Sequence, residues 1–96
     1  MSQTDNPDGQ RSMRLRRLRF RAWHRGLREV DLILGRFADA HVTSLTDDEL
    51  TEFEALLSVP DREVLSWATG EVPVPAANDT GLLRRIITAQ VLERES

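Results

Sequence analysis

Helical periodicity is the feature of this sequence that most restricts its fold. In five separate stretches, apolar residues recur every three to four positions, as they do along one side of an α-helix. Val30, Leu34 and Phe37 illustrate this spacing. No stretch alternates apolar and polar residues over the length of a useful strand. The pattern therefore predicts an all-α fold, a single small bundle of five helices joined by short loops.

Local signals indicate where these helices begin. We expect them to start at about Ser12, just after Gly26, after Thr46, at about Asp61 and at about Thr80. Thr46 and Glu49 form a Thr-x-x-Glu capping box, the clearest start signal in the chain. Asn78 or Asp79 is expected to cap the last helix.

Two segments are expected to lie outside the helices. Residues 1–10 are polar after Met1 and bury too little apolar surface to offset their ordering entropy, so we predict a disordered tail followed by one domain over 11–96. Gly70 suits the end of the fourth helix. Beyond it, Val72–Pro75 is expected to be an extended connector, either docked over the core or exposed, because its two prolines exclude a helix. Because the start is polar, we do not expect a targeting peptide. Because no apolar run approaches ~20 residues, we do not expect membrane insertion.

The charges are divided unevenly along the chain. Eight arginines and no acid lie in residues 11–28, although the formal net charge of the whole chain is −3. Such asymmetry favours a charged partner, whether an acidic protein surface, phosphates or nucleic acid. Arg14, Arg17 and Arg21 share one side of the first predicted helix and, with Arg25, form a basic ridge. A solvated helix surface explains such a stripe equally well.

Nucleic-acid binding is one alternative function, because Phe20 and Trp23 stand among the arginines as surfaces on which bases could stack. Two features argue against it. The acidic remainder of the chain would repel a polyanion, and no second basic helix is present to serve as a recognition element.

The composition also argues against catalysis. The chain has two histidines and no Cys, Tyr or Lys, and its carboxylates show no metal-binding spacing. We therefore do not expect an enzyme that acts alone, or a metal site.

The basic and acidic parts of the chain meet at the string Arg25-Gly26-Leu27-Arg28-Glu29. Glycine inside a helix costs roughly 1 kcal/mol relative to alanine, so Gly26 between two helical patterns suggests a turn or a close backbone approach. Glu29 projects from the second helix on the side opposite its apolar sector. Helix chemistry alone can account for this acid, because a carboxylate in the first turn interacts favourably with the helix dipole.

This string resembles the Arg-Gly-x-x-Glu motif of the FAD assembly factors of succinate dehydrogenase, a family of small five-helix proteins. The similarity extends over about residues 14–92. It includes the lead-in from Leu15 to Arg21 with Phe20 in the aromatic place, Glu29 to Leu34 followed by Phe37-Ala38, Thr46 to Leu50, Leu56-Leu57, Asp61 to Gly70, and the prolines Pro73 and Pro75. Trp23 and Leu27 depart from the residues common in the family, and neither belongs to the Arg, Gly or Glu of the motif.

The resemblance implies an assembly factor located in the bacterial cytoplasm. Such a factor binds the flavoprotein subunit of succinate dehydrogenase, and in some bacteria that of fumarate reductase, and promotes attachment of FAD through its 8α carbon to a histidine of that subunit. It implies no cofactor of the factor's own and no nucleic-acid partner. The alternative is a small basic-helix module that binds nucleic acid or another protein.

The resemblance also implies a partner-binding surface around the motif. Its residues are expected to be Arg25, Gly26, Arg28 and Glu29, together with Arg21, Trp23 and Asp31. Gly26 would let the backbone approach the partner, Arg25 and Arg28 would bind carboxylates or carbonyls, and Glu29 would present an acceptor.

Overall fold

The computed structural model describes residues 7–95, with side chains from residue 9 to residue 90. Five α-helices and two short 3-10 helices make up the fold: α1 (Pro7–Trp23), α2 (Arg28–His41), η2 (Val42–Ser44), α3 (Asp47–Leu56), α4 (Asp61–Ala68), η3 (Ala76–Asn78) and α5 (Gly81–Glu95). No strand occurs within this range. The predicted all-α bundle of five helices is confirmed.

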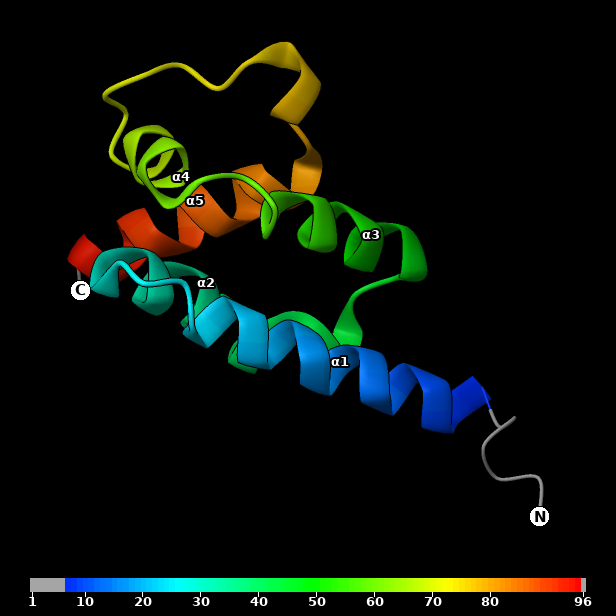
Figure 1. Cartoon of the computed structure of the whole chain (residues 1–96). Coiled ribbons are helices and arrows are strands. Elements are labelled where there is room, and N and C mark those ends of the chain that lie inside the picture. The colour runs from blue at the N-terminus through cyan, green and yellow to red at the C-terminus, as the bar shows by residue number, and fades with distance from the viewer. Residues whose placement is uncertain (1–6, 96) are drawn as a thin grey trace.

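The helices form an elongated body in which α2 packs against α1, α4 and α5. Helices α1 and α2 lie side by side and run in opposite directions, joined by a sharp corner (Figure 1). Helix α5 packs against α2, α3 and α4, and it runs back toward the end of the molecule where that corner lies (Figure 1). The corner and the C-terminal part of α5 therefore lie at the same end of the molecule (Figure 1).

The core is apolar, and each of the five α-helices contributes to it. The predicted stripe of α2 is buried at Val30, Leu34 and Phe37, and α1 contributes Leu18 and Ala22. The other buried core residues are Ala38, Val42, Leu45, Leu50, Phe53, Leu56, Leu57, Val64, Trp67, Leu82, Leu83 and Ile86. Because these side chains come from all parts of the chain, the position of each helix depends on the others.

Most of the predicted helix ends are confirmed. Thr46 and Glu49 form the capping box reciprocally: the Glu49 N–H donates to Thr46 Oγ1 at 3.1 Å, and the Thr46 N–H donates to Glu49 Oε1 at 2.9 Å. Gly70 follows α4 with a φ of +80°, as a left-handed C-terminal cap requires. The predicted cap of α5 was wrong, because Thr80 is the residue whose Oγ1 accepts from the N–H of Leu83 at 3.1 Å.

Helix α1 begins earlier than the sequence indicated. It starts at Pro7, so the predicted disordered tail was wrong for residues 7–10, while residues 1–6 lie outside the described part of the chain. Proline suits the first position of a helix. The first turns are held by Arg11, whose guanidinium donates to Asp47 Oδ1 at 3.0 Å and to the carbonyl of Leu45. These acceptors lie 36 and 34 residues away, so no local pattern reveals them.

The proline connector, Val72–Pro75, is exposed in one part and docked on the core in another, so both of the alternatives left open by the sequence occur. Val72 is exposed, whereas Val74 is half-buried and packs against the core. Within the described range, no helix has the length and apolar character that crossing a membrane requires.

Candidate functional site

The corner between α1 and α2 turns at Gly26. Its φ is +110°, a backbone conformation that residues with a side chain rarely adopt. A Cβ atom placed there would lie 3.6 Å from Asp61 Oδ2, an ordinary contact distance. The glycine is therefore required by the turn rather than by crowding inside the chain. The predicted turn is confirmed, and a close approach of a partner's backbone stays a prediction.

Arg25 points inward from the corner and clamps it to the segment between α3 and α4. Its Nε donates to Asp61 Oδ1 at 2.8 Å, and its two terminal nitrogens donate to the carbonyls of Leu57 and Val59. The Arg25 and Asp61 side chains are only 12% and 18% exposed. We call this set the Arg25 clamp. It occupies the guanidinium that the motif was expected to offer to a partner.

Asp31 also serves the corner from within. Its Oδ1 accepts from the backbone N–H of Arg25 at 2.7 Å, and the residue is half-buried. This bond spans the turn, because Arg25 precedes Gly26 and Asp31 lies in the first turns of α2. Asp31 therefore holds the geometry of the corner.

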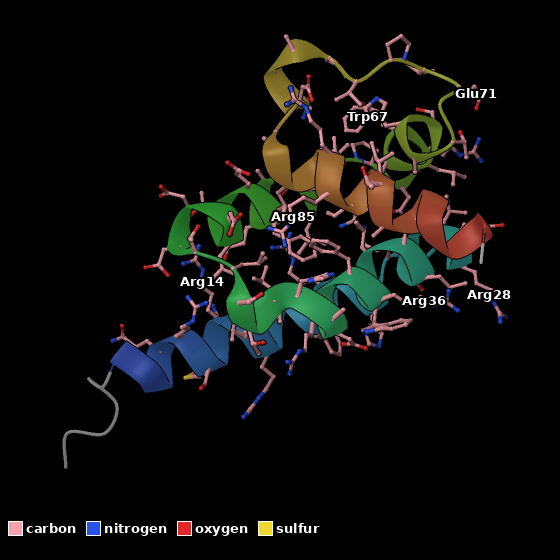
Figure 2. All side chains as sticks on the ribbon, turned by 180° about the vertical axis from the view of Figure 1, so that it is seen from behind. Arg14, Arg28, Arg36, Trp67, Glu71 and Arg85 are labelled. Atoms are coloured by element: carbon pink, nitrogen blue, oxygen red, sulfur yellow. The ribbon has the colours of Figure 1, made fainter. Side chains whose placement is uncertain are left out.

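Arg28 and Glu29 have the opposite orientation. Both are exposed in the first turn of α2, and neither side chain forms a hydrogen bond or ion pair with a described residue. Arg28 points away from the body of the protein (Figure 2). The motif thus divides into an inner half, Arg25 and Gly26, which builds the corner, and an outer half, Arg28 and Glu29, which the corner displays.

Glu29 also stands at the rim of a groove of about 300 Å³ between α2 and α5. The groove is lined by Glu29, Leu32, Ile33, Arg36, Phe37, Ala40, His41, Leu65, Ile86, Ala89 and Gln90. Its lining is mainly apolar, but the Oε1 atom of Gln90 is buried without a hydrogen-bond partner among the described side chains. The sequence analysis missed this groove, because it is formed by helices that are distant in the chain.

Trp23 belongs to the packing between α1 and α2. A Cβ atom on Gly35 would lie 2.3 Å from Trp23 Cδ2, so the indole ring lies directly against the backbone of α2. Its Nε1 donates to Asp39 Oδ2 at 3.2 Å, and the side chain is half-buried. Sequence reasoning did not single out Gly35, although a glycine inside a helix is a recognisable sign of close approach.

The predicted basic ridge is interrupted in the structure. Arg14 reaches from α1 to α3 (Figure 2), where its Nε and a terminal nitrogen donate to the two carboxylate oxygens of Glu54 at 2.8 and 2.9 Å. This bidentate bond, together with the nearby charges of Arg17 and Arg21, lowers the pKa of Glu54 below its ordinary value. Because Arg25 is also used internally, only Arg17 and Arg21 of the four ridge arginines remain exposed.

The two histidines lie apart and serve different contacts. His24 stacks on Phe20, with ring centroids 4.0 Å apart, and His41 packs against Phe37 at 4.6 Å. Among the residues described, no group of three histidine or carboxylate side chains is placed to hold a metal ion. The chemistry that the corner offers is therefore recognition, through one exposed cation, one exposed acid and an adjacent apolar groove.

Known proteins are similar to this chain over most of its length. The family described as the flavinator of succinate dehydrogenase matches residues 16–90. A protein of Acetobacter pasteurianus named FAD assembly factor SdhE is 41% identical over 81 residues, which are 84% of this chain and 74% of that protein. No solved structure matches the chain.

Mitochondrial proteins named succinate dehydrogenase assembly factor 2 are also similar. That of Meyerozyma guilliermondii is 41% identical over 63 residues, 66% of this chain and 47% of that protein. That of Dictyostelium discoideum is 31% identical over 71 residues, 74% of this chain and 50% of that protein. The chain thus spans about half the length of these two relatives.

The family match includes the whole corner, helices α2, α3 and α4 in full, and most of α5. Together with the identity to the Acetobacter protein, it confirms the predicted resemblance and the prediction of an assembly factor rather than an enzyme. On this basis, the chain belongs to the family of flavinators of succinate dehydrogenase.

Proposed function

We propose that this chain binds the flavoprotein subunit of succinate dehydrogenase and promotes covalent attachment of FAD to it. Family membership supports this assignment, as does the 41% identity to a protein named as an FAD assembly factor. The flavoprotein subunit of fumarate reductase is the second client that we propose. The proposed factor carries no cofactor of its own, because FAD goes to the partner, and it acts in the bacterial cytoplasm.

The observation that carries the proposal is the division of the motif. Arg25 and Asp31 fix the corner through bonds of 2.8 and 2.7 Å, and Arg28 and Glu29 stand exposed on it. A fixed backbone lowers the entropy that docking side chains lose on binding. The corner is therefore suited to recognise a partner through Arg28 and Glu29.

The proposed contribution of the chain is positional. The bond to FAD forms between the flavin and a histidine of the partner subunit, and the assembly factor binds the partner conformer in which these two are aligned. Preferential binding shifts the population toward that conformer. A conformer populated at about 1% becomes half of the total only if it is bound about 100-fold more tightly than the others. The corner and the groove beside Glu29 are the surfaces proposed to supply this preference.

Covalent flavinylation of the co-expressed flavoprotein subunit tests the proposal. The subunit is denatured, and the flavin fluorescence that it retains is measured with and without this chain. We expect the wild-type chain to raise the retained fluorescence and Glu29→Ala to lower the rate of labelling by about tenfold, the loss typical of one important interface contact. Glu63→Ala is the matched control, because Glu63 is an exposed acid in the first turn of α4.

Two outcomes would contradict the proposal. If the flavoprotein subunit retains the same amount of covalent flavin with and without this chain, the proposed function is wrong. If Glu29→Ala and Glu63→Ala change the rate of labelling equally, the role assigned to Glu29 is wrong. Repeating the assay with the fumarate reductase subunit decides whether that protein is a second client.

A further inference from the structure

Five exposed side chains share one face of α1, and His24, directly after the helix, continues it; the five are Met13, Arg16, Arg17, Phe20 and Arg21. We call these six residues the α1 outer face. From Met13 to Arg21 it extends along about 12 Å of the helix, at 1.5 Å per residue. Met13 and Phe20 are 57% and 64% exposed, and they are two of the three large apolar side chains that stand exposed in the described part of the chain. Their burial is not needed for the fold.

Phe20 has an aromatic partner despite its exposure. Its ring stacks on that of His24, with an interplanar angle of 16° and centroids 4.0 Å apart. The His24 ring is held in turn by a 2.7 Å hydrogen bond between its Nδ1 and the carbonyl of Phe20. The pair therefore presents a flat aromatic surface whose side-chain entropy is already reduced, as interface anchors require.

Among the described residues, the arginines of this face have no bonded partner, unlike Arg11 and Arg14 on the same helix. Arg11 and Arg14 bind carboxylates of α3, whereas Arg16, Arg17 and Arg21 form no hydrogen bond or ion pair within the described residues. The charges of Arg17 and Arg21 reach Glu54, but the carboxylate of Glu54 is already held by Arg14. The face therefore directs three guanidinium groups toward solvent, none of them bonded to a carboxylate of the described residues.

The combination of residue types indicates a protein partner. Arginine, methionine and aromatic residues are the types enriched in protein–protein interfaces. A nucleic-acid strand carries charge along its whole length, and here it would meet the carboxylates of Asp47 and Glu54, which lie beside α1 at the ends of Arg11 and Arg14. A protein can place its acids opposite the free arginines alone.

We propose that the α1 outer face is a second docking surface for the flavoprotein subunit, and that it takes a carboxylate-rich patch beside a shallow apolar pocket. The inference rests on the proposed function, which supplies the partner. The face leads directly into the corner, because His24 precedes Arg25 in the chain (Figure 1). One partner surface can therefore contact both Glu29 and the arginines of α1.

Binding of the purified chain to the purified flavoprotein subunit tests this surface. The dissociation constant is measured by titration calorimetry at several salt concentrations. We expect the double variant Arg17→Ala/Arg21→Ala to bind about tenfold more weakly at low salt, with a shallower dependence on salt. Phe20→Ala is expected to weaken binding by a similar factor at every salt concentration, because its contact is apolar.

Matched controls separate this effect from general changes in charge or hydrophobicity. Arg62→Ala removes an exposed arginine of α4 that has no bonded partner in the described part of the chain, and Val72→Ala shortens the third large apolar side chain exposed there. Both are expected to leave the dissociation constant unchanged. Thermal unfolding followed by circular dichroism is expected to be unaffected by the Phe20 and arginine variants, because these side chains pack against nothing in the core.

The outcomes distinguish this inference from the proposed function. If the wild-type chain raises covalent flavin but the α1 variants bind like the controls, the second surface is refuted and the function stands. If the wild-type chain neither binds the subunit nor raises covalent flavin, the function fails and this inference with it. Salt-dependent binding of an oligonucleotide that is lost in Arg17→Ala/Arg21→Ala, with subunit binding unchanged, would assign the face to nucleic acid and overturn the inference.

Discussion

Gly26 is the residue whose conformation most directly determines the shape of the site. With its φ of +110°, a side chain at this position is disfavoured even though a Cβ would have room. We expect Gly26→Ala to lower the free energy of unfolding by about 1–2 kcal/mol, the usual cost of a left-handed conformation for a residue with a Cβ. Urea unfolding followed by circular dichroism measures the change.

Gly81→Ala is the control for this prediction. Gly81 is the first residue of α5, has no positive φ, and has nothing within 4 Å of its would-be Cβ. Its replacement should cost nothing, so equal losses at the two glycines would show that the turn tolerates a side chain. The strain at Gly26 also affects the choice of functional variant: Gly26→Arg would disturb both fold and docking, whereas Glu29→Ala changes only an exposed side chain.

At the scale of elements, the packing of α1 on α2 depends on the contact between Trp23 and Gly35. A Cβ on Gly35 would overlap the indole at 2.3 Å from Cδ2. We expect Gly35→Ala to destabilise the protein by about 1–3 kcal/mol through overpacking. In the Trp23→Ala background the same change should be neutral or stabilising by up to about 1 kcal/mol, because alanine favours the helix over glycine.

The four proteins of this double-mutant cycle are compared by urea unfolding. Additive effects of the two substitutions would show that the indole does not lie on Gly35 in solution. Trp23→Ala by itself also tests whether this side chain has the partner-binding role implied by the family resemblance. If Trp23→Ala lowers covalent flavin on the partner by no more than the fraction of the variant that is unfolded, Trp23 contributes through packing alone.

At the scale of the whole molecule, the Arg25 clamp joins the α1–α2 corner to the loop between α3 and α4 and to the first residue of α4. Removing the guanidinium would leave Asp61 and the carbonyls of Leu57 and Val59 without their donor in a site where the side chains are 12% and 18% exposed. We expect Arg25→Ala to lower the free energy of unfolding by about 2–4 kcal/mol. Arg25→Lys should recover only part of this loss, because an ammonium cannot copy the planar fork.

Arg28→Ala is the control for the clamp, because Arg28 is exposed and three residues away. It should change the unfolding free energy by no more than about 0.5 kcal/mol. Equal effects of Arg25→Ala and Arg28→Ala in urea unfolding would contradict the inward assignment of Arg25. The pair also separates stability from docking, since Arg28→Ala is expected to act on partner binding alone.

The predictable features of this protein are those encoded by residues close together in the chain. Thr46 and Glu49 form their capping box within a single turn, and Gly70 ends α4 through its own φ of +80°. The sequence did not predict that α1 starts at Pro7 or that Thr80 caps α5, and the two reasons differ. Arg11 stabilises the first turns through α3, and several residues before α5 could each have capped it.

The sequence by itself determined the five helices, their buried sides and the exposed position of Glu29, because helical periodicity depends on neighbours three and four residues apart. Only the tertiary structure decided which arginine of the motif faces inward. Arg25 and Arg28 are the same residue type, but Arg25 finds its carboxylate 36 residues away, whereas Arg28 finds no acceptor among the described residues. The groove beside Glu29 also depends on the tertiary structure, because α2 and α5, which line it, come into contact only when the chain has folded.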